Sequence, residues 1–384
     1  MFGVPNWLYS NFDLKYVLLR VFMQSENLLE SDLRATGTIQ KKSRSKKANL
    51  LIWLHSITFV LGFALLVLVM YWLGYRTILE SLSRVGWGFL PIIALNVIRH
   101  FLRASSMYLA VPREHRNFKY RNAVAARFGG EAVSFLTFTG PFLGDATKAI
   151  LLKKNVSLTQ GASAVLIDNV LYYVSVILMI LAGVGAFVYY FESSSRMMSG
   201  VLWAIVICSV LIFAVLSLAI RYKITPLSRI IAMLERRRLA PKFVLKMRDG
   251  ILNVETNVFQ FYHQRRTDFF VLFGISSFVH VVSMCEVFLA LKLLGFESFW
   301  STAFIIESLT KVINVIFSFV PGTIGVYEGG NSVILLSLGY TAVVGVELAL
   351  VRRVAIMFSL FVGLVILLWR TVDRGTKTLV KPTD

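Results

Sequence analysis

The stretch FSFVPGTIGVYE, residues 317–328, breaks an otherwise apolar region that runs from residue 302 to residue 339. Pro321 and Gly322 stand together in it, and Gly325 follows three residues later. Proline and glycine interrupt helices, and the arm after this break is too short to cross a hydrocarbon core of about 30 Å. The pattern therefore predicts a re-entrant hairpin of two half-helices, with its irregular backbone enclosed by protein.

A second apolar region, residues 122–153, is interrupted in the same way by TGPFLG at residues 139–144. Its second arm is also short, because Lys153 and Lys154 bring polar sequence back soon after the break. We expect a second re-entrant hairpin here. A pair of short, tilted full spans in each region is the alternative.

Six further stretches are long and apolar enough to cross a bilayer as helices. They are residues 50–73, 86–110, 161–190, 199–221, 268–293 and 343–369. The composition agrees, because 57% of the 384 residues are hydrophobic and only 16% are charged, against about 25% charged in soluble domains. The sequence predicts an all-α polytopic membrane protein with about six full spans and two Gly/Pro-broken hairpins.

The chain carries a formal net charge of +19, and the positions of its cations orient the spans. Basic residues gather at both ends of the membrane region and in the connections at 113–127 and 221–266, whereas 191–198 and 294–301 contain almost none. The positive-inside rule then places both termini in the cytoplasm of a bacterial inner membrane, with the two hairpins entering from opposite sides. We expect anionic lipid headgroups, and no nucleic acid, as partners of this charge.

The order of span, broken hairpin and span occurs twice. It occupies residues 86–190 and then, in the opposite sense through the membrane, residues 268–369. The TGPFLG break of the first copy is echoed by VPGTIG in the second. Inverted repeats with broken helices are typical of alternating-access transporters, which hold their substrate near the midplane.

The domain organisation follows from these boundaries. Residues 1–49, with a basic tract at 41–47, form a cytoplasmic or interfacial segment, residues 50–370 form the transmembrane domain, and residues 371–384 form a cytoplasmic tail. The basic insertion at 222–266 mixes apolar residues with arginine and lysine. Two interpretations stay open for it: an amphipathic helix on an anionic leaflet, or a solvated helical hairpin.

Ionisable residues inside the apolar regions are the candidate site, because each costs about 2.5–3.5 kcal/mol at the centre of a membrane helix. In the first repeat they are Arg99, Arg103, Glu131, Asp145, Lys148 and Asp168. In the second repeat they are Glu307, Lys311, Glu328, Glu347, Arg352 and Arg353. The last two lie about ten residues into the final span, near mid-bilayer and too deep for their charges to reach water easily.

These residue types fit a lipid headgroup. The guanidinium of arginine matches phosphate, and helix N-termini at the hairpin tips offer N–H groups to an anion. The carboxylates of Asp145, Asp168 and Glu328 suit a cationic headgroup, or lock the site by pairing with the arginines. The alternative is a set of static ion pairs that hold the hairpins, and Glu307 and Lys311, four residues apart, are spaced to neutralise each other.

Enzymatic signatures are missing from the sequence. It contains no HExxH, Walker loop, CxxC or GxSxG motif, and we expect no catalytic residue, no bound metal and no cofactor. The two cysteines, Cys208 and Cys285, lie in apolar runs and are expected to be small buried hydrophobes.

The motifs around both breaks resemble the lysylphosphatidylglycerol synthase transmembrane-region family. The resemblance covers roughly residues 50–370 and is carried by GPFLGDATKA at 140–149, the following residues 162–168, VPGTIGVYE at 320–328 and LVRR at 350–353. The family also includes flippase-like proteins and membrane proteins associated with hopanoid synthesis. The resemblance implies a lipid-translocating domain, which in the fused members flips an aminoacylated phospholipid made by a cytoplasmic domain. Only about fifteen residues follow the last span here, so we expect no aminoacyl transferase.

We therefore expect the chain to translocate a lipid or lipid-linked headgroup, with membrane phospholipids and a lipid-synthesising enzyme as partners. The cargo stays open among an aminoacyl lipid, a glycolipid, a polyprenyl-phosphate carrier and a hopanoid. One alternative is a membrane-embedded enzyme acting on lipid-linked substrates, with Asp145 and Asp168 as bases or metal ligands. Another is a small-solute or ion transporter of the same architecture.

Overall fold

The protein is all-α within the part of the chain that its structure, a computed structural model, describes. That part comprises residues 85–137, 140–153, 156–190, 196–237 and 248–379, with Glu80 and Ser83. It forms eleven α-helices and no strand, which confirms the predicted fold class. The chain divides into two compact units, Leu54–Ile366 and a second made of Met1–Trp53 and Leu367–Asp384. The helices and contacts described below belong to the first of these units, apart from the end of the last helix from Leu367 on.

Two predictions fall on residues outside the described part. They are the N-terminal segment 1–49 and the span at 50–73, and they stay predictions. The boundaries of the tail and of the transmembrane domain stay predictions as well.

Among the described residues, four helices are long and apolar enough to cross a membrane. They are α7 (Leu158–Tyr190), α8 (Arg196–Arg221), α12 (Arg266–Leu293) and α15 (Ala342–Leu379). The candidate span within α8 begins at Ser199, and the one within α15 ends at Leu367. They confirm four of the predicted stretches as apolar helices. The stretch 86–110 also forms a helix, α4 (Phe89–Ala110), after a short 3-10 turn η2 (Gly86–Gly88), but α4 is not among the four.

Glycine ends α12 and a shorter helix, α14 (Val326–Ser337). Gly295 follows α12 with a φ of 87°, and Gly339 follows α14 with a φ of 86°. After each glycine, an N–H reaches back over the last turn: Phe296 donates to the Leu291 carbonyl and Tyr340 to that of Leu335, both at 3.0 Å. A left-handed residue satisfies the last carbonyls of a helix in this way, and glycine adopts that conformation without strain.

Both broken regions are helical hairpins. The first consists of α5 (Tyr120–Leu136) and α6 (Gly140–Leu152), and the second of α13 (Trp300–Ile316) and α14 (Val326–Ser337), with a 3-10 turn η4 (Pro321–Thr323) between them. At 1.5 Å per residue, α6 and α14 are only about 20 Å and 18 Å long, shorter than a hydrocarbon core of about 30 Å. These lengths favour re-entrant hairpins over pairs of full spans.

Small residues let the arms of the first hairpin approach each other. A Cβ built on Gly144 would lie 2.6 Å from the Cβ of Ser134 and 2.7 Å from the carbonyl oxygen of Gly130. A Cβ on Gly130 would lie 2.3 Å from Cγ of Lys148. Glycine at both positions is therefore a packing requirement of the α5–α6 crossing.

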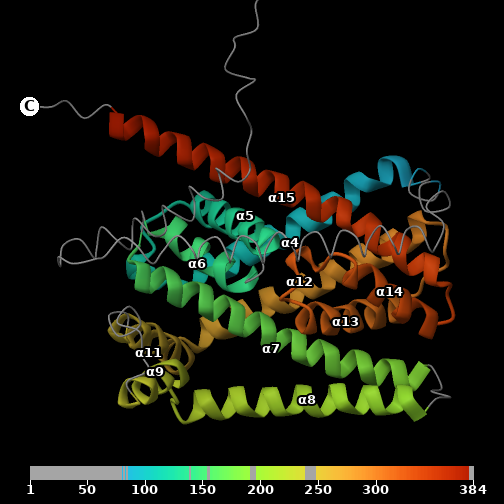
Figure 1. The fold of residues 1–384 in the computed structure, drawn as a ribbon, viewed down its shortest axis with the longest axis horizontal. Helices are drawn as coiled ribbons and strands as arrows, with labels where there is room; N and C mark the ends of the chain where they lie inside the picture. The colour runs from blue at the N-terminus through green and yellow to red at the C-terminus, as the bar shows by residue number, and fades with distance from the viewer. Residues whose placement is uncertain are drawn as a thin grey trace, which may run out of the picture. The chain divides into compact units, whose positions relative to one another are not determined.

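The tips of the two hairpins meet. A Cβ built on Gly140, at the start of α6, would lie 3.3 Å from the carbonyl oxygen of Ser318. A Cβ built on Gly322 would lie 2.6 Å from the ring of Phe135. Gly322 itself has a φ of 60°, so the turn needs glycine for its backbone as well as for this contact. Within the first unit, α5 and α6 lie toward one end and α13 and α14 toward the other (Figure 1).

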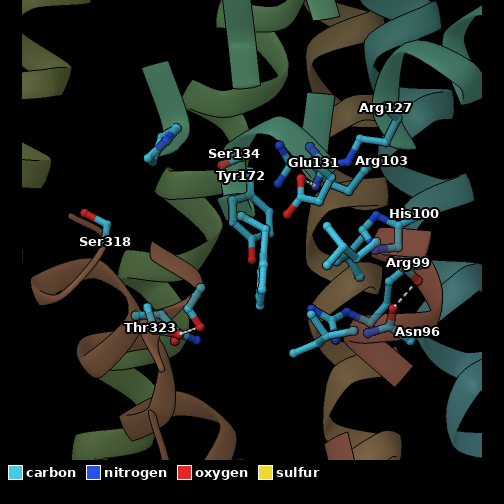
Figure 2. Close-up of a pocket in the computed structure, with 18 of the residues that line it drawn as sticks. Asn96, Arg99, His100, Arg103, Arg127, Glu131, Ser134, Tyr172, Ser318 and Thr323 are labelled. Carbon is cyan, nitrogen blue, oxygen red and sulfur yellow. Dashed lines mark hydrogen bonds and ion pairs between the residues drawn. The ribbon is translucent and has the colours of Figure 1, made fainter. Parts of the chain in front are cut away.

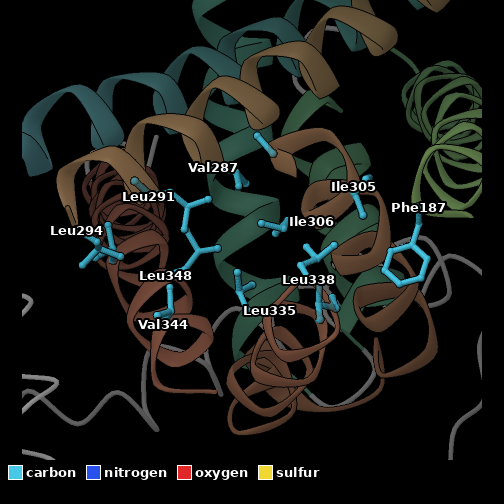
Figure 3. Packing of buried hydrophobic residues seen from close by; sticks show 14 of the residues in the cluster. Phe187, Val287, Leu291, Leu294, Ile305, Ile306, Leu335, Leu338, Val344 and Leu348 are labelled. Carbon is cyan, nitrogen blue, oxygen red and sulfur yellow. The ribbon is translucent and has the colours of Figure 1, made fainter. Parts of the chain in front are cut away.

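The hydrophobic core lies around the second hairpin. Side chains from α7, α12, α13, α14 and α15 converge there, and Figure 3 shows Leu291, Ile306, Leu335 and Leu348 among them. Each of these four is fully buried. Burial of a leucine or isoleucine contributes about 1.5–3 kcal/mol, so this cluster fixes the second hairpin against its neighbouring helices.

The basic insertion contains a folded helical hairpin, α9 (Pro226–Arg236) and α11 (Arg248–Gln264). The Glu255 carboxylate on α11 accepts hydrogen bonds from the hydroxyl and the N–H of Ser228 on α9. The side-chain amide of Asn257 donates to the Ser163 hydroxyl on α7 at 3.1 Å. The insertion is therefore attached to the transmembrane helices by polar contacts.

A short 3-10 turn, η3 (Arg113–His115), follows α4.

The expectation that both cysteines are buried was wrong: Cys208 is exposed on α8 and Cys285 is half-buried. The apolar run around Cys208 belongs to a helix whose surface is mostly left uncovered, so hydrophobicity there did not indicate burial within the protein.

Candidate functional site

A polar cavity of about 320 Å³ lies where the hairpin tips meet α4, α7, α12 and α15. Figure 2 shows Arg99 and Arg103 of α4 along one wall, and Ser318 and Thr323 of the second hairpin's tip across the space. The cations that line it are Arg99, Arg103, Arg127, Lys148, Lys311, Arg352 and Arg353. A cavity of this size and polarity, inside helices this apolar, needs a polar occupant.

Arg352 on α15 is the centre of a four-helix charge network. Its Nε donates to Glu286 at 3.1 Å and its Nη2 to the Ser283 hydroxyl at 3.2 Å. Its Nη2 also lies 2.9 Å from Oε2 of Glu307. The other carboxylate oxygen of Glu307, Oε1, lies 2.5 Å from Nζ of Lys311. The spacing of Glu307 and Lys311 suggested that they neutralise each other. In the structure they do pair, but Glu307 is shared between Lys311 and Arg352.

Glu286 on α12 bridges two arginines. Its second oxygen accepts a hydrogen bond from Nη1 of Arg99 at 2.8 Å. The side chain is 1% exposed, and a buried carboxylate is stable only when cations pair with it. Glu286 thus ties α4 to α15 across the cavity.

Arg353 holds the tip of the second hairpin. Its Nε donates to Glu328 at 2.5 Å and its Nη1 to the Gly322 carbonyl at 3.1 Å. The other Glu328 oxygen accepts the N–H of Gly325 at 2.7 Å, which places this carboxylate on the N-terminus of α14. The helix N-terminus expected to receive a ligand anion is therefore occupied by a side chain of its own helix.

Arg103 organises the other side of the cavity. Its Nε and Nη2 donate to one oxygen of Asp168 at 3.1 Å and 2.7 Å, and Nη2 also donates to Asn169 at 3.0 Å. The Asn169 amide donates to Asp145 at 2.5 Å, and Asp145 accepts from Lys148 at 2.9 Å. The chain of contacts links α4, α7 and α6.

Two further contacts complete this wall. Arg103 lies 3.9 Å from the centre of the Tyr172 ring, a cation–π distance. Arg127 pairs with Glu131 at 3.0 Å on α5. Glu131 keeps 42% of its side chain exposed, so it is the carboxylate of these pairs most open to the cavity.

Several guanidinium donors have no hydrogen-bond partner among the described residues. These buried atoms are Nε of Arg99, Nε of Arg127, Nη1 of Arg352 and Nη2 of Arg353. All four residues line the cavity. Unpaired buried donors cost about 1–3 kcal/mol each or more when charged, so the contacts among the described residues leave these four guanidiniums incompletely satisfied.

The balance of charge also favours an anion. The seven cations are paired with six carboxylates, those of Glu131, Asp145, Asp168, Glu286, Glu307 and Glu328. Three of these, Asp168, Glu307 and Glu328, do not line the cavity. They stand behind the arginines and lysine, so the cavity surface itself is more positive than the cluster as a whole.

The structure brings together eleven of the twelve residues predicted from the sequence, eight on the cavity wall and three directly behind it. Glu347 is the exception, since it is buried on α15 but does not line the cavity.

Three residues of the site were missed. Glu286 lies inside the predicted span 268–293, where any carboxylate is expensive, so the rule that selected the other candidates applied to it as well. Arg127 was assigned to a loop from its basic neighbours, yet it lies on α5 and is buried. Nothing local to Tyr172 distinguishes it from packing aromatics, because its role depends on Arg103, 69 positions earlier in the chain.

Comparison with known protein families gives a match over most of the chain. A family model described as the lysylphosphatidylglycerol synthase TM region is similar to this chain over residues 59–363. That range contains every residue of the cavity described above. No curated protein and no solved structure matches the chain.

Proposed function

The chain belongs to the lysylphosphatidylglycerol synthase TM-region family, and from this premise we propose that it translocates a lipid or lipid-linked headgroup across the bacterial inner membrane. The observation that carries the proposal is the cavity at the meeting hairpin tips, with its buried and partly unpaired guanidinium groups. On this proposal the chain is not an enzyme, and membrane phospholipids are its substrates.

The physical task of such a protein is to shelter a charged headgroup from hydrocarbon. A lipid phosphate carries a negative charge that is costly to move across the bilayer unprotected. The Arg352 and Arg353 guanidiniums provide planar donors for phosphate oxygens. Glu131, the most open carboxylate, provides a contact for an amine on the same headgroup. The acyl chains would stay in the bilayer, so the cavity needs to hold the headgroup alone.

The arrangement of the hairpins supports an alternating-access mechanism. We propose that the two repeats, 86–190 and 268–369, are inverted, with one hairpin reaching in from the cytoplasm and the other from outside. The contact of Gly140 with Ser318 would then be a gate at mid-membrane. Opening one side of the cavity while this contact shifts would expose the headgroup to each face in turn.

A matched pair of double variants tests the proposal. Arg353→Gln with Glu328→Gln removes a buried pair from the cavity without leaving one charge unpaired. Arg248→Gln with Glu235→Gln removes an exposed pair of similar length, 3.0 Å, from the insertion. Both variants keep the net charge of the protein unchanged, so a difference between them does not come from the overall charge.

Each protein is reconstituted in vesicles with fluorescent phosphatidylglycerol, and flipping is followed by a membrane-impermeant quencher. The wild type and the Arg248/Glu235 variant should flip the lipid, while the cavity variant should be slower by about tenfold or more, the equivalent of one charged hydrogen bond. Equal rates for both variants, or no flipping by the wild type across a panel of anionic, zwitterionic and aminoacyl lipids, would count against the proposal. A lipid recovered in chemically altered form would favour the enzyme alternative.

A further inference from the structure

The helix α9 carries an exposed face that the transport site does not use. Ile230 and Met233 are 50% and 49% exposed, large fractions for apolar side chains three residues apart on one helix. Arg229, Arg236 and Arg237 are exposed beside them. At 100° per residue, these five side chains fall on one half of the helix, with Met233 between Arg229 and Arg237 and Ile230 at the edge beside Arg237.

The opposite face of α9 is already occupied by α11. Ile231 is buried, and Ser228 is hydrogen-bonded to Glu255. Glu235, the one carboxylate of α9, is paired with Arg248 at 3.0 Å. The five exposed side chains named above are therefore cations and apolar groups, while Glu235 is paired with Arg248 and Ser228 is hydrogen-bonded to Glu255.

The chain places α9 close to a membrane surface. The candidate span α8 ends at Arg221, and α9 begins at Pro226, so at most about 18 Å of chain separates their ends. The chain also turns back at once, because Lys223 has a φ of 50° and the Ile224 N–H donates to the Ala219 carbonyl at 2.9 Å. Tyr222, 66% exposed at this turn, is a residue type that prefers the interface of a bilayer.

We propose that α9 lies in the headgroup layer of an anionic leaflet, with Ile230 and Met233 inserted among the acyl chains and the three arginines on lipid phosphates. Helices with an apolar stripe bordered by arginine bind anionic interfaces in this orientation. Because Ser228 and Glu235 attach α9 to α11, and Asn257 of α11 contacts Ser163 on α7, the lipid contact acts on the end of a transmembrane helix next to the cavity. The inference does not depend on the transport function.

Site-directed fluorescence on the full chain tests this placement. In a background with Cys208 and Cys285 replaced by alanine, an environment-sensitive dye is attached at Ile230→Cys, Met233→Cys or Asn253→Cys. Asn253 is exposed on α11 and serves as the matched control. The proteins are placed in nanodiscs of phosphatidylcholine alone or with phosphatidylglycerol.

With phosphatidylglycerol present, the dyes at 230 and 233 should show blue-shifted emission and at least ~3-fold stronger quenching by nitroxide-labelled lipids than the dye at 253. Replacing the three arginines by glutamine should remove most of this difference. Because all three positions are exposed, the replacements should leave the folded structure unchanged. Dyes at 230 and 233 as accessible to water as the dye at 253 would overturn the proposal. Protection that is equal without phosphatidylglycerol would overturn its anionic selectivity, and protection in detergent that rises with protein concentration would assign the face to a second copy of the chain.

Discussion

Replacing Glu286 by glutamine should destabilise the protein strongly, because this carboxylate is the shared partner of two buried guanidiniums. It accepts a bond from Arg99 at 2.8 Å and one from Arg352 at 3.1 Å. Glutamine has the same shape but no charge, and its one carbonyl oxygen can serve only one of the two donors. Arg352 keeps Glu307, whereas Arg99 loses the one ion pair that the described residues give it.

The magnitude follows from burial. Removing one partner of a buried ion pair costs about 3–5 kcal/mol, and the hydrogen bond that glutamine retains puts the expected loss near the lower limit, about 3 kcal/mol. For a large domain 1 kcal/mol corresponds to about 2–4 °C in the unfolding midpoint, so the expected decrease is about 6–12 °C. The same change at Glu235, whose pair with Arg248 is nearly half exposed on both sides, should cost about 0–1 kcal/mol.

Thermal unfolding of both variants in one detergent, followed by the loss of the monodisperse peak in size-exclusion chromatography, measures the difference. Adding Arg99→Gln to Glu286→Gln should recover part of the loss, since no cation is then left without its partner. A Glu286→Gln midpoint no lower than that of Glu235→Gln would refute the idea that the charge network holds α4, α12 and α15 together.

Three further outcomes are expected. Gly144→Ala should lower the unfolding midpoint by an amount equivalent to about 1–3 kcal/mol, because its Cβ would press on α5. The control Gly185→Ala, with open space around it, should leave the midpoint unchanged or raise it. Equal midpoints for the two variants would contradict the close crossing of α5 and α6. Gly140→Cys with Ser318→Cys should form a disulfide on mild oxidation and stop lipid flipping until a reductant is added, and unaltered flipping by the crosslinked protein would rule out a gate at the hairpin tips. Glu131→Gln should slow flipping of an aminoacyl lipid more than flipping of phosphatidylglycerol, as competition between the two lipids in the vesicle assay would reveal, and equal slowing would argue against an amine contact at this carboxylate.

Local chemistry was enough to predict the two hairpins. Adjacent proline and glycine interrupt an apolar run at both places, so the breaks at 139–144 and 317–328 were visible without any knowledge of neighbouring helices. The cost of charge in hydrocarbon likewise selected Arg352 and Arg353 from the sequence, and both are buried in the structure.

Partners of the charges were beyond such reasoning. Arg103 and Asp168 lie 65 positions apart, and Arg352 and Glu286 lie 66 apart, so no helical periodicity relates them. The one pair that spacing did suggest, Glu307 with Lys311, exists but shares its carboxylate with Arg352. Periodicity describes one helix at a time, whereas a network of charges is set by how several helices are packed.

Arg353 binds the turn of the second hairpin at two points, the Glu328 carboxylate and the Gly322 carbonyl. On the proposed function, an anionic headgroup would compete with both for the same guanidinium, and the carboxylate that it would displace is the one that also caps α14. Binding of the anion to Arg353 and loosening of the turn of the second hairpin would then result from the same exchange of counter-ions. Occupancy of the site and mobility of the turn should consequently rise together, in proportion to how much of Arg353 the ligand takes.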